Sequence, residues 1–146
     1  MDKARAPRSD DGVPSEDVLR RLRVPFIRRA SLTWEGRRQD VFVIDLALTG
    51  VFVEWPSPPP VDTRLDLTFQ LPENEIPIVA GCRVAWCHTP DPDKERRPLP
   101  AGAGLEFISL TPDAADRLRQ YLVDYYRRDP RARRFIPHGA PREGGS

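Results

Sequence analysis

The sequence predicts a small, mainly β domain, a barrel or a sandwich, that ends in one helix. Pro and Gly divide the central part of the chain into short segments rich in β-branched and aromatic residues, which is typical of such folds. Near residue 112 the apolar residues change to helical spacing. A chain of 146 residues with 39% apolar side chains can build one modest core, and hardly two. We therefore expect one domain with terminal arms.

Six segments have strand character and are separated by turn or loop residues. They span residues 24–34, 41–44, 51–55, 65–71, 76–88 and 103–108. Prolines at 56, 58, 59 and 60 cannot donate to a sheet, so they predict an exposed connection between the third and fourth strands. Apolar residues alternate within 76–88, so one face of this strand should point into the core. That face carries Ile78, Ala80, Cys82, Val84 and Trp86.

The C-terminal part of the domain has the signals of an amphipathic helix. Thr111 can cap it, Pro112 suits the first helical position, and Asp113 favours the positive end of the helix dipole. Apolar residues then recur at helical spacing as far as Tyr125. We expect a helix over 112–127 that packs on the barrel.

The two ends of the chain have the composition of flexible arms. Residues 1–17 are rich in Asp, Arg, Pro and Ser, and residues 129–146 combine arginines with proline and glycine. Such segments bury too little apolar surface to offset the entropy of ordering. We expect a folded domain over 18–128, a flexible N-terminal arm over 1–17 and a disordered basic tail over 129–146.

Charge and composition exclude several classes of function. Lys and Arg total 23 against 22 Asp and Glu, and a net charge of +1 gives no general attraction to DNA, RNA or a membrane. No apolar run is long enough to cross a bilayer or to form a signal peptide, so we expect a cytoplasmic protein. The two histidines fit no catalytic triad, and the sequence has no phosphate-loop motif, so we expect no enzyme and no cofactor.

The two cysteines, Cys82 and Cys87, lie in one predicted strand. Their odd separation points them to opposite faces, and an extended chain places them beyond the reach of a disulfide. With His88 they form a C-x4-C-H string, which supplies too few ligands for a structural zinc site. We expect both thiols to be reduced and no metal to be bound.

Four motifs add specific landmarks to this general plan. They are RRLRVPF over 20–26, DLALTGVF over 45–52, RVAW over 83–86 and GAGLEF over 102–107. In this order, and followed by a helix, they resemble the PilZ domain family over about Arg20 to Arg128. The resemblance implies a six-stranded antiparallel β-barrel that binds cyclic di-GMP through an RxxxR motif and a D/N-x-S-x-x-G motif.

The resemblance also implies which residues bind the nucleotide. They are Arg20, Arg21, Arg23, Asp45, Ala47 and Gly50. A guanidinium can fork onto phosphate or a guanine edge and stack on a base, and the aspartate can accept from guanine N–H groups. Gly allows a sharp turn of the backbone. Arg83 of the third landmark faces either the ligand or solvent.

Two positions depart from the family pattern. Leu19 stands where the first arginine of RxxxR is expected, and its nearest substitutes are Arg20 and Arg21. Ala47 replaces the serine of the second motif. Loss of one hydrogen bond to a charged group costs about 1.5 to 3 kcal/mol, or roughly 10- to 100-fold in affinity.

These observations leave two functions open. The first is a signalling domain in which the arginines clamp phosphate and base, Asp45 recognises guanine, and binding is relayed through protein contacts. The second is a PilZ-like adaptor that does not bind the nucleotide and acts by protein contacts in motility, pilus or signalling systems. In that case Asp45 and Gly50 only shape a turn, and the arginines form a solvated approach to the barrel.

Overall fold

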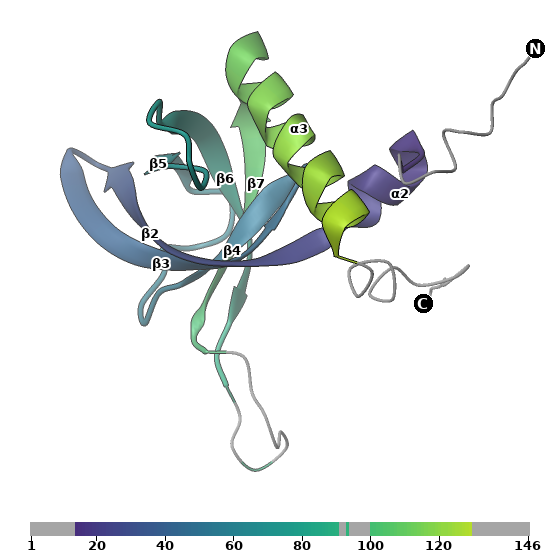
Figure 1. Ribbon diagram of the computed structural model, residues 1–146. Helices are drawn as coiled ribbons and strands as arrows, with labels where there is room; N and C mark the ends of the chain where they lie inside the picture. Colours follow the sequence, from purple (N-terminus) through teal and green to yellow (C-terminus); the bar gives the residue numbers. More distant parts are fainter. Residues whose placement is uncertain (1–13, 91–92, 94–99, 130–146) are drawn as a thin grey trace, which may run out of the picture.

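The fold is a closed six-stranded barrel followed by one helix, in a computed structural model that describes residues 14–90, 93 and 100–129 (Figure 1). The strands are β2 (Arg23–Trp34), β3 (Arg37–Ala47), β4 (Gly50–Glu54), β5 (Arg64–Phe69), β6 (Ile78–His88) and β7 (Gly102–Ser109). Every neighbouring pair is antiparallel, in the order β2-β3-β4-β7-β6-β5. The predicted fold class, a six-stranded antiparallel barrel with a C-terminal helix, is confirmed.

Strands β2 and β3 form a hairpin that extends beyond the apolar segment predicted from the sequence. The turn uses Glu35 and Gly36, both with positive φ (52° and 73°), which suits the twist of a tight hairpin. Trp34 therefore pairs with Arg37, and the polar residues 37–40 join the ladder. Cross-strand pairing, rather than apolar content, extends β3 to Arg37.

The barrel interior holds the core, and the alternation predicted for β6 is largely correct. Ile78, Ala80, Cys82 and Val84 are all at most 1% exposed. Trp86, predicted for the same face, is 40% exposed, so that prediction is wrong. The reason is an irregularity in the β6–β7 pairing, where Val84 pairs with Leu105 but Trp86 pairs with Gly104. Two steps along β6 correspond to one along β7, which breaks the alternation of faces.

The C-terminal helix α3 (Pro112–Arg128) matches its predicted span and its predicted cap. The Thr111 hydroxyl accepts a hydrogen bond from the backbone N–H of Ala114 at 3.1 Å. Leu118 and Leu122 are fully buried in the core cluster. No helix in the part of the chain that the structure describes is long and apolar enough to span a membrane.

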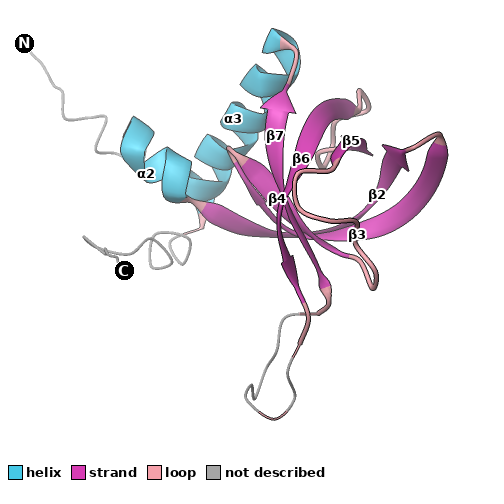
Figure 2. Ribbon diagram, turned by 180° about the vertical axis from the view of Figure 1, so that it is seen from behind, coloured by secondary structure: helices cyan, strands magenta, loops and turns pink. Residues whose placement is uncertain are grey.

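A short helix that the sequence analysis did not predict, α2 (Glu16–Arg21), precedes the barrel. Ser15 caps it by accepting from the Val18 N–H at 3.2 Å. Its residue Leu19 and the following Leu22 are buried in the core. Helices α2 and α3 lie side by side in both views (Figure 2). The arms expected over 1–17 and 129–146 lie outside the described residues, apart from 14–17 and 129.

Candidate functional site

A pocket of about 240 Å³ lies where the start of β2 meets β4, β6 and β7. Its lining residues are Arg23, Ala47, Thr49, Gly50, Val51, Arg83, Ala85, Trp86, Gly104, Leu105 and Glu106. Three of the six residues that the resemblance assigned to nucleotide binding are among them, namely Arg23 from the first motif and Ala47 and Gly50 from the second. Residues distant in the chain are therefore gathered at one place by the closure of the barrel.

Arg23 and Asp45 face one another beside this pocket. The Nη1 atom of Arg23 lies 3.5 Å from Oδ1 of Asp45. In the β2–β3 ladder, Asp45 pairs with Pro25, two positions along β2 from Arg23. Burial raises the pKa of Asp45 above its usual value, while the Arg23 charge and the Phe52 backbone N–H oppose that shift. The carboxylate is thus partly desolvated and oriented, which suits recognition of an N–H donor.

Gly50 is required by the close approach of two strands. A Cβ at this position would overlap the carbonyl oxygen of Leu105 on β7. Because the obstacle is backbone, no change of rotamer can relieve it. Ala47, the other small residue of the second motif, is 2% exposed and lines the pocket. A larger side chain at either position would reduce the space in the pocket.

Trp86, which was predicted from the sequence to lie in the core, forms an aromatic wall of the pocket. Its ring is stacked on Phe52, with centroids 5.2 Å apart and planes 21° apart. A Cβ on Gly104 would overlap the indole, so this glycine gives the ring its place. The only signal in the sequence was the presence of a tryptophan three residues after Arg83 in the RVAW landmark, because an aromatic side chain can stack on a base.

Arg83 also lines the pocket, and acidic side chains hold it there. Its Nε and Nη2 atoms donate to Oε1 of Glu106 at 3.0 and 2.7 Å, and its Nη1 donates to Oδ1 of Asp62 at 2.6 Å. These hydrogen bonds raise the pKa of the guanidinium. An anionic ligand would have to compete with Glu106 and Asp62 for this arginine.

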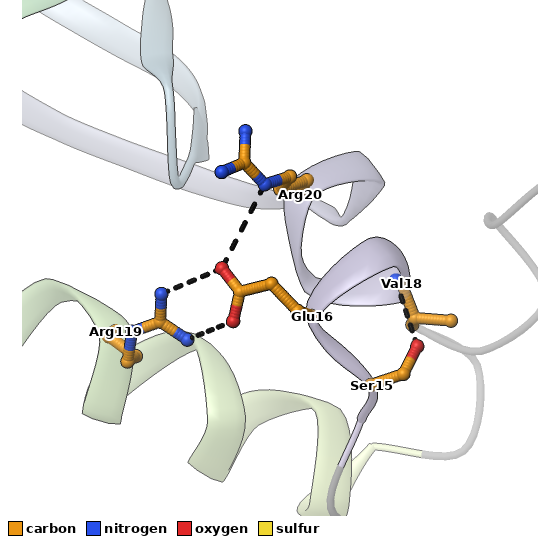
Figure 3. Close-up of polar contacts among 5 residues, drawn as sticks. All are labelled: Ser15, Glu16, Val18, Arg20 and Arg119. Carbon is orange, nitrogen blue, oxygen red and sulfur yellow. Dashed lines mark hydrogen bonds and ion pairs between the residues drawn. The ribbon is translucent and has the colours of Figure 1, made fainter.

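Arg20 and Arg21 do not line the pocket. Both lie on α2, where Arg20 pairs with Glu16 at 3.8 Å and Arg21 pairs with Asp17 at 3.3 Å. Glu16 also accepts two hydrogen bonds from Arg119 of α3, at 2.7 and 2.8 Å (Figure 3). The structure therefore brings Arg23, Asp45, Ala47 and Gly50 together and leaves these two arginines apart from them.

The described residues contain no cluster of three or more His, Cys, Asp or Glu side chains that could hold a metal ion. Cys82 is buried and Cys87 is exposed, and both are free thiols.

Comparison with known proteins gives a family and a fold. A model of the PilZ domain matches residues 17–124. The structure of Bacillus subtilis inhibitor of motility (MotI/DgrA) matches at 19% identity and a TM-score of 0.58, over 70% of this chain and 48% of that chain. The Borreliella burgdorferi PlzA protein in complex with c-di-GMP matches at 15% identity and a TM-score of 0.45, over 78% and 38%. The chain thus spans about half or less of either protein. No curated protein matches the chain.

Proposed function

Since this chain belongs to the PilZ domain family, we propose that it is a cytoplasmic signalling domain that binds cyclic di-GMP and relays binding through contacts with another protein. PilZ domains are non-enzymatic receptors or adaptors. The observation that carries the proposal is that Arg23 and Gly50 line one pocket with an exposed tryptophan, and that Asp45 lies beside it, 3.5 Å from Arg23. Arg23 supplies a cation, Asp45 an oriented acceptor, Gly50 a close approach of the backbone, and Trp86 a stacking surface.

Each side chain has a role that follows from its chemistry. Arg23 is 58% exposed at its side chain and offers a guanidinium fork to phosphate or to a guanine edge. Asp45 accepts from guanine N–H groups. Trp86 stacks on a base, an interaction worth about 1–3 kcal/mol per base. Arg83 contributes a second cation when the ligand displaces Glu106 from it.

The adaptor that lacks the nucleotide is the second candidate, and it rests on the same pocket. Arg83 is already neutralised by Glu106 and Asp62. Ala47 supplies no hydroxyl, and Leu19 is buried in the core instead of facing a ligand. On this reading the barrel presents protein contacts only.

Calorimetric titration of the full chain with cyclic di-GMP separates the two candidates. The receptor predicts heat of binding at micromolar ligand that is lost in Arg23→Ala and in Asp45→Ala. Arg64→Ala, an exposed arginine of β5 that does not line the pocket, is the matched control and should bind as the parent does. A flat trace for the parent at high ligand concentration rejects the receptor and favours the adaptor.

Two further variants measure how far the site is weakened. Ala47→Ser restores a hydroxyl and should tighten binding by roughly 10- to 100-fold. Glu106→Gln removes a negative charge close to the ligand phosphates, which is worth about 1 kcal/mol at 4 Å in water, or about 5-fold. If neither variant changes affinity, the nucleotide binds elsewhere.

A further inference from the structure

A second depression, which shares no lining residue with the nucleotide pocket, opens between β2 and β5. These strands pair only over Ser31–Thr33 and Asp66–Thr68. Strand β2 also includes the residues from Arg23 up to this paired segment, and β5 extends beyond it to Phe69, but these parts of the two strands do not pair with each other. Because the ladder stops, the strands leave a groove of about 530 Å³, which we call the β2–β5 groove.

Arginines surround the β2–β5 groove and lack acidic partners. Arg28 and Arg29 of β2 and Arg38 of β3 line it. All three are exposed, and no ion pair joins any of them to another described residue. Arg38 donates only to the Ser31 hydroxyl at 2.9 Å. Asp40 is the one carboxylate among the described lining residues, so the groove keeps a local positive charge.

Several arginines elsewhere in the described part of the domain are paired with carboxylates, whereas the groove brings three arginines without an ion pair to one surface. Arg83, Arg117 and Arg119 each donate to a carboxylate at 2.6 to 2.8 Å. What sets the groove apart is that Arg28, Arg29 and Arg38 line one depression together. Opposite charge placed there would gain attraction without first breaking an internal ion pair.

Exposed apolar side chains flank the same arginines. Ile27, adjacent to Arg28, is 71% exposed, and Phe42 is 44% exposed. The Arg29 guanidinium lies over the Phe42 ring, 5.7 Å from its centroid. Arginine and aromatic residues together are enriched at protein interfaces. A polyphosphate has no apolar group to contact Ile27 and Phe42, whereas a peptide segment can supply both carboxylates and apolar side chains.

We propose that the β2–β5 groove is a docking site for an extended, acidic segment of a partner protein. The carboxylates of the segment pair with the guanidinium forks of Arg28, Arg29 and Arg38, which match carboxylate geometry in a bidentate way. Apolar residues of the segment contact Ile27 and Phe42. The site does not depend on the nucleotide pocket.

The test uses the full chain and a short fluorescein-labelled peptide in which Glu and Thr alternate, with fluorescence anisotropy at low salt. A peptide with Gln in place of Glu is the ligand control. The double variant Arg29→Glu with Arg38→Glu should weaken binding of the acidic peptide at least about 10-fold. Arg64→Glu with Arg127→Glu has the same net charge, changes two exposed arginines outside the groove and should weaken it by less than about 2-fold.

Three results would overturn the proposal. The first is absence of binding by the parent, and the second is equal weakening in both double variants, which would show general charge attraction. The third is binding of phosphatidylserine vesicles or a single-stranded oligonucleotide, but not the acidic peptide, with loss in the groove variant alone. Circular dichroism spectra that match the parent confirm that the variants are folded.

Discussion

Gly104→Ala should destabilise the domain through one identifiable neighbour, the indole of Trp86. A Cβ built on Gly104 overlaps the indole, and its three nearest heavy atoms all belong to Trp86. The indole is stacked on Phe52, which is only 1% exposed. The indole must move to accommodate the methyl group, and Phe52 then loses the stacking contact that shields it from solvent.

The expected size follows from three contributions. Overpacking by a methyl group costs about 1–3 kcal/mol, and loss of an aromatic stack costs about 0.5–1.5 kcal/mol. The lower entropy of the unfolded alanine chain opposes these by about 0.4–1 kcal/mol. Gly104→Ala should therefore lower the free energy of unfolding by about 0.5–4 kcal/mol. In a Trp86→Ala background the methyl group meets no indole, and the same change should cost less than about 0.5 kcal/mol.

Urea unfolding followed by far-ultraviolet circular dichroism measures all four proteins of this cycle without relying on tryptophan emission. Gly102→Ala is the control, because its Cβ would overlap the carbonyl oxygen of Val53, a backbone atom that remains in either background. It should stay destabilising whether or not Trp86 is present. Equal costs of Gly104→Ala with and without Trp86 would refute the reasoning.

Three other predictions concern single side chains. Burial raises the pKa of the Cys82 thiol to about 12, and the negative charge of Asp66 adds to the effect. Ellman's reagent should therefore react with one thiol in the folded parent, with none in folded Cys87→Ser, and with two in the unfolded parent. Burial raises the pKa of Asp45, so its ionised form destabilises the fold above that pKa and the penalty fades as the pH falls through it. Asp45→Asn should thus be more stable than the parent at neutral pH, with a gap in urea midpoints that narrows towards about pH 4; a gap that widens would contradict this. Leu19→Arg should lower the free energy of unfolding by about 2–4 kcal/mol, whereas Leu19→Met should change it by less than about 1.5 kcal/mol.

The elements with strong local signals were predictable from the sequence. Six strands and α3 were found because prolines, glycines, alternation and a capped apolar stripe all act within a few residues. Helix α2 was not predicted, although Ser15 is a good cap and its terminal charges suit the helix dipole, because six residues are too few for apolar spacing to reveal a helix. It is held by Leu19 in the core and by the contact of Glu16 with Arg119, which lies 103 positions away. Such a contact leaves no local pattern.

The site was predictable only in part, for a similar reason. The two motifs named Arg23, Asp45 and Gly50; closure of the barrel places Arg23 and Gly50 in the lining of one pocket and Asp45 beside Arg23. Trp86 was misassigned because a pairing irregularity in β6 reverses the alternation on which the prediction depended. The contacts of Arg83 with Glu106 and Asp62 join three strands or loops and could not be derived from spacing.

Helix α2 changes what Leu19 means for nucleotide binding. If the segment before β2 were extended, an arginine at position 20 instead of 19 would start at most about 3.6 Å further along the chain, a shift that its long side chain can absorb. In a helix, the same one-residue shift rotates the side chain by about 100° around the axis. Leu19 points into the core at 1% exposure, while Arg20 points outward to Glu16.

With α2 docked, Arg20 does not line the pocket, and its Nε lies 3.8 Å from Oε2 of Glu16. A contribution of Arg20 to the proposed nucleotide site would draw on undocking or unwinding of α2. Undocking exposes Leu19 and separates Glu16 from its two hydrogen bonds with Arg119. Any binding energy that Arg20 supplies is reduced by the free energy of that step. On the proposed function, the affinity of the pocket would be linked in this way to the docking of α2 on α3 for Arg20, but not for Arg23, which already lines the pocket.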